Sequence, residues 1–162
     1  MKKMNFKSES GFTLMELMVV IGVLAILIAI LLPQFTGYTA QAQAISAASE
    51  AKNALTAGYS YYVSITSRDA NASAFSTTTA EDRMKKAANN TSATVTVTSA
   101  TDATYQVRKG NLEFTAHMDL TTGTIKAPAT GGNAGEMTCS AVNGGNAQTC
   151  TDLQNEGALK IQ

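Results

Sequence analysis

Four side chains in this sequence have the types and spacing to do chemistry. Glu16 is a carboxylate inside a run of apolar residues. Cys139 and Cys150 are the two thiols of the chain, and His117 is its single imidazole. An acidic side chain in a membrane helix costs about 3 kcal/mol near the centre of the bilayer and less near its edge. Glu16 therefore either lies at the membrane interface or has a positive partner on another chain.

No arrangement of residues in the sequence indicates a catalytic site. The Gly-x-Ser-x-Gly pattern of hydrolases, a phosphate-binding Gly-rich loop and the His-Glu-x-x-His zinc motif are all missing. We also predict no metal or catalytic role for His117. The chain has 12 basic and 12 acidic side chains, so no excess of positive charge favours nucleic-acid binding. We therefore expect a protein that is not an enzyme and has no cofactor and no metal site.

The N-terminal segment is predicted to enter a membrane and to stay there. The segment Met1–Gly11 has three lysines, and 18 of the 21 residues from Phe12 to Leu32 are apolar. As a helix, such a stretch spans about 31 Å, which matches a hydrocarbon core. The apolar part of a removable signal is shorter, about 7 to 15 residues. The lysines predict a cytoplasmic N terminus, with the chain from Pro33 onward exported.

Export bears on the two cysteines, because disulfides persist in oxidising compartments. Both lie in the Gly- and Asn-rich segment Ala127–Gln162. A disulfide between Cys139 and Cys150 would close a 12-residue loop and stabilise the fold by about 3 kcal/mol. The sequence favours this disulfide over two free thiols or a metal-binding pair.

One long helix is predicted to position the N-terminal residues. From Gln34 to Tyr62, small and apolar residues recur at steps of three and four, which indicates one buried face: Ala40, Ala44, Ala47, Ala48, Ala51, Ala54 and Leu55. We predict a helix from about Thr13 to Tyr62. Its first half would span the membrane, and its second half would pack on a sheet.

Alternation of apolar and polar residues predicts β-strands after residue 92. The strands are expected at Thr94–Thr98, Thr104–Arg108 and Leu112–Asp119, with a short strand near Ile125. A tight turn is expected at Lys109-Gly110-Asn111. His117 falls on the outward face of its strand. The fold class is therefore α+β: a long N-terminal helix packed against a small antiparallel sheet, with a C-terminal disulfide loop.

A short helix is predicted before the first strand. Thr78-Thr79-Ala80-Glu81 has the pattern of a capping box, with the helix running from Ala80 to Ala88. In such a box the Glu81 carboxylate would bond back to the start of its own helix.

The residues Gly11-Phe12-Thr13-Leu14-Met15-Glu16-Leu17 resemble the processing site of type IV pilins and pseudopilins. In that family a membrane peptidase cleaves after the Gly and N-methylates the new N-terminal residue, here Phe12. Pro33 stands at position 22 counted from Phe12, where pilins commonly have a Pro that bends the helix. The resemblance covers about residues 11 to 62. One departure is Ala25, at a position where the family often has Gly.

The resemblance implies an organisation in four parts: a leader at 1–11, a transmembrane and filament-core helix at 12–32, an amphipathic stalk helix at 33–62, and a globular head at 63–162. It implies a major pilin that is anchored once in a bacterial inner membrane and then polymerises into an extracellular pilus, or fimbrium. Such filaments serve adhesion, twitching motility or DNA uptake. The implied partners are other copies of the chain, the prepilin peptidase and an inner-membrane assembly platform, with surface ligands or DNA bound through the filament.

The resemblance also gives Glu16 a partner. Cleavage after Gly11 makes Phe12 a free amine, and Glu16 of one subunit can neutralise Phe12 of its neighbour. This pairing predicts an axial stagger of about 6 Å between adjacent subunits, because the two residues lie four apart on a helix. Removal of the leader leaves nine basic and eleven acidic side chains, a net charge of −2.

Two alternatives stay open. The chain could be a pseudopilin of type II secretion or a minor pilin, or it could be a binding domain anchored by a single span. The second leaves Glu16 and the Gly11-Phe12 junction unexplained. The disulfide loop either presents an adhesive surface or fastens the C terminus to the sheet. Met4 is an alternative start to Met1.

Overall fold

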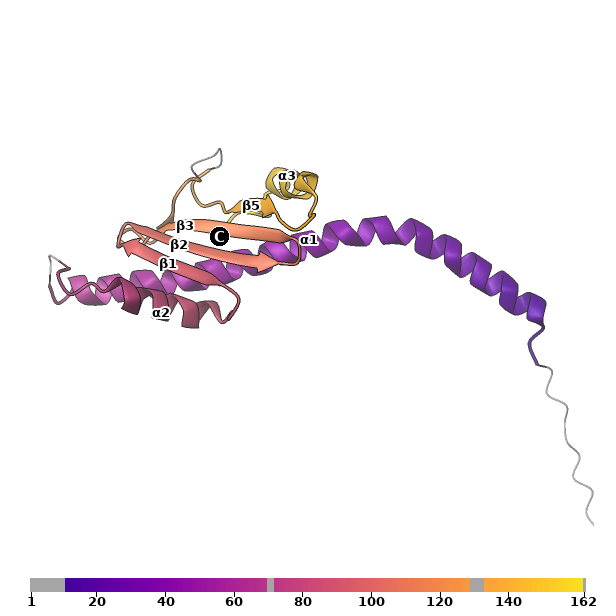
Figure 1. Cartoon of the computed structure of the whole chain (residues 1–162), viewed down its shortest axis with the longest axis horizontal. Helices are drawn as coiled ribbons and strands as arrows, with labels where there is room; N and C mark the ends of the chain where they lie inside the picture. Colours follow the sequence, from indigo (N-terminus) through magenta and orange to yellow (C-terminus); the bar gives the residue numbers. More distant parts are fainter. Residues whose placement is uncertain (1–10, 70–71, 129–132, 162) are drawn as a thin grey trace, which may run out of the picture. The chain divides into compact units, whose positions relative to one another are not determined.

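The computed structural model describes residues 11–69, 72–128 and 133–161, except for the side chains of residues 33–36. Its elements follow one another as α1 (Leu14–Thr66), α2 (Thr77–Ala88), β1 (Thr94–Ser99), β2 (Asp102–Lys109), β3 (Leu112–Asp119), β4 (Thr124–Ile125), β5 (Thr138–Ala141) and α3 (Ala147–Asn155) (Figure 1). The chain divides into two compact units between Tyr38 and Thr39, and α1 contributes to both.

The first unit consists of the N-terminal part of α1. The stretch Leu14–Leu32 has a mean hydropathy of 3.0, and none of it is buried. Among the described residues, it is the one stretch of helix long and apolar enough to cross a membrane. Its helical state follows from its composition of Leu, Ile, Val, Ala and Met without an interior breaker before Pro33, apart from Gly22.

The second unit begins with the remainder of α1, which ends at Thr66, four residues beyond the predicted end at Tyr62. The predicted inner face is confirmed, because its seven residues are buried. Six of them are alanines, so the helix backbone can approach the sheet closely. Gly58 continues this face: a Cβ there would lie 2.8 Å from Leu120 Cδ2 and 2.9 Å from Met84 Sδ.

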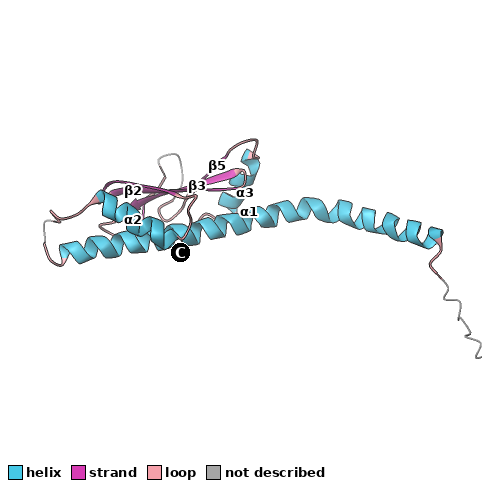
Figure 2. Cartoon of the chain, turned by 60° about the horizontal axis from the view of Figure 1, so that its bottom comes forward, coloured by secondary structure: helices cyan, strands magenta, loops and turns pink. Residues whose placement is uncertain are grey.

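The sheet is antiparallel in the order β1-β2-β3-β4, with β5 paired to β3. Figure 2 shows this sheet nearly edge-on beside the C-terminal part of α1. The four predicted strands are confirmed. The register places Tyr105 opposite Ala116 and Val107 opposite Phe114, so alternate residues form one buried face. Gly110 has a φ of 60° at the predicted turn between β2 and β3, a conformation that glycine adopts without strain.

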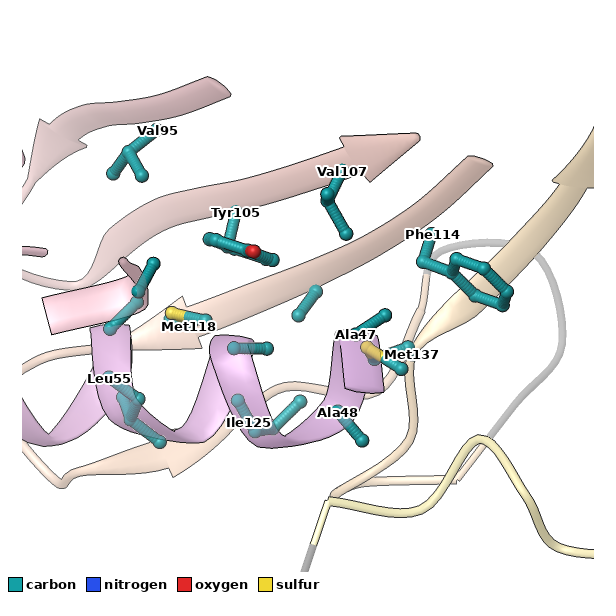
Figure 3. Packing of buried hydrophobic residues seen from close by; sticks show 14 of the residues in the cluster. Ala47, Ala48, Leu55, Val95, Tyr105, Val107, Phe114, Met118, Ile125 and Met137 are labelled. Carbon is teal, nitrogen blue, oxygen red and sulfur yellow. The ribbon is translucent and has the colours of Figure 1, made fainter. Parts of the chain in front are cut away.

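The hydrophobic core lies between this buried face and α1. Six of its residues are labelled in Figure 3. Tyr105, Phe114 and Met118 come from the sheet, and Ala47, Ala48 and Leu55 come from α1. The largest fully buried side chains are Tyr105, Phe114, Met84, Met118, Leu120, Met137, Leu153 and Val107. Each buried side chain of this size contributes about 1.5–3 kcal/mol of hydrophobic stabilisation.

Helix α2 begins earlier than predicted, and the capping-box prediction at Thr78 is wrong. Ser76 is the N-cap, and its Oγ accepts a hydrogen bond from Thr79 N at 3.3 Å. A serine has the same capping chemistry as Thr78, so the pattern alone did not decide between them. Glu81 does not bond back to its own helix end. Its Oε1 accepts a hydrogen bond from Val97 N of β1 at 2.8 Å.

The C-terminal region contains two elements that the sequence did not predict, β5 and α3. Strand β5 pairs with β3, with Cys139 opposite Phe114. Helix α3 has Asn146 as its N-cap and buries Leu153. Gln41 of α1 donates a hydrogen bond to Glu156, just after α3, at 2.6 Å. The Gly- and Asn-rich tail is therefore an ordered part of the head over the residues that the structure describes.

Candidate assembly site

The first turn of α1 holds the Glu16 carboxylate. Thr13 donates two hydrogen bonds to Glu16 Oε2, from its backbone N at 3.1 Å and from Oγ1 at 3.2 Å. Glu16 N donates in return to Thr13 Oγ1 at 3.2 Å. This arrangement is a capping box with Thr13 as the N-cap. Our sequence prediction missed Thr13, although the spacing Thr-x-x-Glu signals it.

The capping box lowers the free-energy cost of an acidic side chain in this apolar segment. Its carboxylate satisfies an N–H group at the start of the helix and lies at the positive end of the helix dipole. Both residues follow the Gly11-Phe12 bond, so cleavage there leaves both in the chain. A single subunit thus lowers the cost of this acid without a second chain.

The Gly11-Phe12 junction is exposed. Phe12 has 90% of its surface accessible, and a Cβ built on Gly11 would have nothing within 4 Å. Residues 1–10 of the predicted leader lie outside the described residues. Cleavage at this junction stays a prediction.

Pro33 lies within α1, which is helical from Leu14 to Thr66. Its side chain is outside the described part of the structure. A bend at Pro33 stays a prediction.

The apolar side chains between Phe12 and Leu32 form a surface that the described chain leaves uncovered. Their exposed fractions run from 49% for Leu31 to 90% for Phe12. Soluble monomers rarely expose apolar surface of this extent. The segment therefore needs a lipid bilayer or other protein chains around it.

Comparison with known proteins bears on this segment. Residues 6–32 match the family model described as "Prokaryotic N-terminal methylation motif". Two proteins of Pseudomonas aeruginosa, each named "Fimbrial protein", are 46% identical over 54 residues. The match covers 33% of this chain and 35% of each relative. No solved structure matches the chain. By its N-terminal segment, this chain is similar to type IV pilins.

The similarity to a methylation motif and to two fimbrial proteins agrees with the prediction that the chain is not an enzyme. The chain spans about a third of the length of the two relatives that it matches. The description of the head therefore rests on its structure.

The predicted disulfide is confirmed. Cys139 of β5 and Cys150 of α3 are bonded, with their Cα atoms 5.5 Å apart. The alternatives of free thiols and of a metal-binding pair are thereby excluded. The bond ties α3 to β5, and β5 is part of the sheet, so it fastens the C-terminal region to the head. An adhesive role stays a prediction.

His117 is half-buried on the outward face of β3, and its Nδ1 lies 3.4 Å from Thr104 Oγ1. It borders a cavity of about 560 Å³ next to the disulfide, whose other polar lining residues include Thr115, Thr138, Ser140 and Thr151. Among the described residues, no group of three or more His, Cys, Asp or Glu side chains could hold a metal ion.

One polar cluster in the head joins α1 to the sheet. Glu50 Oε1 accepts hydrogen bonds from Lys109 Nζ at 2.6 Å and Ser46 Oγ at 3.1 Å. Glu50 Oε2 accepts from Tyr105 Oη and Asn90 Nδ2, each at 2.8 Å. These partners come from α1, β2 and the segment before β1. The cluster therefore fixes the helix against the sheet at a polar point beside the apolar core.

The charges of this cluster shift two pKa values. Burial would raise the pKa of Glu50, but the hydrogen bonds from Lys109, Asn90, Tyr105 and Ser46 together outweigh burial and lower it. Burial, together with the hydrogen bond and charge of Glu50, raises the pKa of Tyr105 well above its ordinary value. Glu50 is therefore a carboxylate and Tyr105 a hydroxyl donor at neutral pH.

Proposed function

We propose that the chain is a structural subunit of a type IV pilus, the major pilin, and that it polymerises through its N-terminal helix. The observation that carries the proposal is the uncovered apolar helix from Phe12 to Leu32 with one acid, Glu16, in its first turn. The match to the methylation motif and to two fimbrial proteins supports it. Adhesion, twitching motility and DNA uptake are the uses that we propose for the filament.

The proposed precursor has its leader at 1–11, its membrane and filament-core helix at 12–32, its stalk at 33–62 and its head at 63–162. It crosses the inner membrane once, with the N terminus in the cytoplasm, before it joins an extracellular filament. The prepilin peptidase cleaves after Gly11 and methylates Phe12. The assembly platform in the inner membrane then adds the subunit to the filament.

Assembly then exchanges the partner of Glu16. Before assembly, the carboxylate is bonded to Thr13 of its own chain. In the filament, the Phe12 amine of a neighbour supplies a full positive charge, which the neutral donors of Thr13 do not, so a Coulomb attraction adds to the hydrogen bond. The ion pair favours a fixed axial stagger of neighbouring subunits because the two groups must meet.

Intact-mass measurement of filaments sheared from the cell surface tests the proposal. The expected result is an abundant component whose mass corresponds to residues 12–162 with one N-methyl group and one disulfide. A trace amount would favour a minor pilin or a pseudopilin. Absence of the chain from the filaments, or a chain that retains residues 1–11, would contradict the proposal.

A further inference from the structure

Strand β1 forms an outer edge of the head's sheet. It pairs with β2 and ends the strand order β1-β2-β3-β4. Edge strands present N–H and C=O groups to which another chain can bind. The sequence of β1, Thr-Val-Thr-Val-Thr-Ser, is rich in β-branched residues and has no charge and no proline. These properties favour pairing between identical strands.

The register identifies the backbone groups that point out of the sheet. In an antiparallel pair, the N–H and C=O of one residue point to the same side, and neighbouring residues alternate. Val97 N donates to Glu81 of α2, which lies outside the β1–β2 pair. The backbone groups of Val97 therefore point out of the sheet, and alternation directs those of Val95 the same way. Thr96 lies between them.

Helix α2 carries the acceptor for this outward group. It packs against β1 and runs beside it (Figure 1), with Ala80, Met84 and Ala88 buried. Glu81 follows Ala80, and its Oε1 lies 2.8 Å from Val97 N. A charged acceptor makes this a stronger bond than a neutral one would be. The carboxylate thus occupies the position that a carbonyl oxygen of an added strand would take.

We propose that Glu81 closes this sheet edge against a second copy of the chain. The strand that it keeps out is β1 of that copy. The sequence is self-complementary: in a symmetric antiparallel pair, Val95 of each copy faces Val97 of the other, and Thr96 faces Thr96. The inference concerns the head alone and does not depend on whether the chain forms pili.

A cross-linking experiment on the full chain in detergent micelles tests the proposal. Thr96→Cys places a thiol at the centre of the symmetric pair, where opposed Cα atoms lie about 4.5 Å apart, within the range that a disulfide spans. Cys139 and Cys150 are already bonded. Combined with Glu81→Ala, the new cysteine should give about tenfold or more covalent dimer, since the lost bond is worth at least about 1.4 kcal/mol.

Two variants control the experiment. Asp82→Ala removes an exposed acid from the same helix and should leave the amount of dimer at the level of Thr96→Cys alone. Glu81→Gln keeps an oxygen acceptor and should also stay low. Equal dimer in Glu81→Ala and Asp82→Ala would overturn the proposal. Dimer in Glu81→Gln as abundant as in Glu81→Ala would overturn it as well.

Amide hydrogen exchange supplies a second measurement on the same samples. In Glu81→Ala, the Val97 amide should exchange about tenfold faster or more, because it loses its acceptor. The buried residues of the β2–β3 pair, such as Tyr105, should keep the exchange rates of their amides. Unchanged exchange at Val97, or faster exchange without dimer, would show that Glu81 does not close the edge.

Discussion

The N-terminal helix and the head of this protein contain the same kinds of apolar residue, but only the head buries them within the chain. Every large apolar side chain from Phe12 to Leu32 is at least 49% exposed. In the head, apolar residues from α1, α2, the sheet and α3 are buried in one core. The stability of the head is therefore internal to the chain, whereas the N-terminal helix depends on lipid or on other subunits. Substitutions in the two regions should have separable effects.

The largest effect is expected from Glu16→Ala. We predict that it abolishes or sharply reduces incorporation into filaments, because the Phe12 amine of a neighbour loses its partner. The unfolding of the head should not change, since Glu16 bonds to Thr13 and not to the head. Filament yield and urea unfolding of the purified chain in micelles measure the two effects.

Thr13→Ala distinguishes pairing from capping. It removes the side-chain cap, which is worth about 1 kcal/mol, and leaves the Glu16 charge in place. Filaments should therefore form at reduced yield. If Thr13→Ala were as severe as Glu16→Ala, capping and not pairing between subunits would explain the importance of Glu16.

The second largest effect is expected from removal of the disulfide. Replacing Cys139 and Cys150 with serine together should lower the free energy of unfolding of the head by about 3 kcal/mol, because the unfolded chain gains the freedom of an open loop. Urea unfolding followed by near-ultraviolet circular dichroism of the tyrosines measures the change. The helical content of the N-terminal segment in micelles should stay the same. An unchanged unfolding midpoint would contradict this assignment.

Substitution of Glu50 should give a pH-dependent effect. Glu50→Gln removes the charge that accepts from Lys109 and should cost about 2 kcal/mol at pH 7. A carboxylate whose pKa is lowered by folding stabilises the fold above its unfolded pKa, about 4.3, and this stabilisation is lost as pH falls through the folded pKa. The difference from the natural chain should therefore shrink below about pH 4.3.

Unfolding midpoints between pH 7 and pH 3 measure this dependence. Glu113→Gln, on the outer face of the sheet, is the matched control. A difference between Glu50→Gln and the natural chain that stayed constant over the whole range would show that the Glu50 charge does not matter.

A last comparison concerns two glycines, one in each region. A Cβ at Gly145 would lie 2.4 Å from the backbone oxygen of Asn111, so Gly145→Ala should destabilise the head by about 2 kcal/mol. A Cβ at Gly22 would have nothing within 4 Å, so Gly22→Ala should leave unfolding of the head unchanged. If the two variants unfolded at the same denaturant concentration, close packing around Gly145 would not contribute to the stability of the head.

The sequence predicted the elements whose signals are local. Alternation identified β1 to β3, a turn signal at Thr122-Gly123 indicated β4, and three-and-four spacing identified the inner face of α1. The sequence did not predict α3, because one buried leucine in a Gly- and Asn-rich tail gives a weak periodic signal. Glu50 and Glu81 were beyond its reach for another reason: their partners lie 16 to 59 residues away along the chain, apart from Ser46. Thr13 was within reach, since its partner is three residues away.

The alanines on the inner face of α1 have a consequence for how this protein can change during evolution. Alanine has no side-chain rotamers, so neither a larger residue nor a shifted strand can be accommodated there by side-chain rearrangement. The distance between helix and sheet is in effect set by the two backbones. The outer face of the sheet, with its threonines, has no such limit. Sequence divergence should therefore accumulate on the outward face of the head, while the alanine positions of α1 stay small.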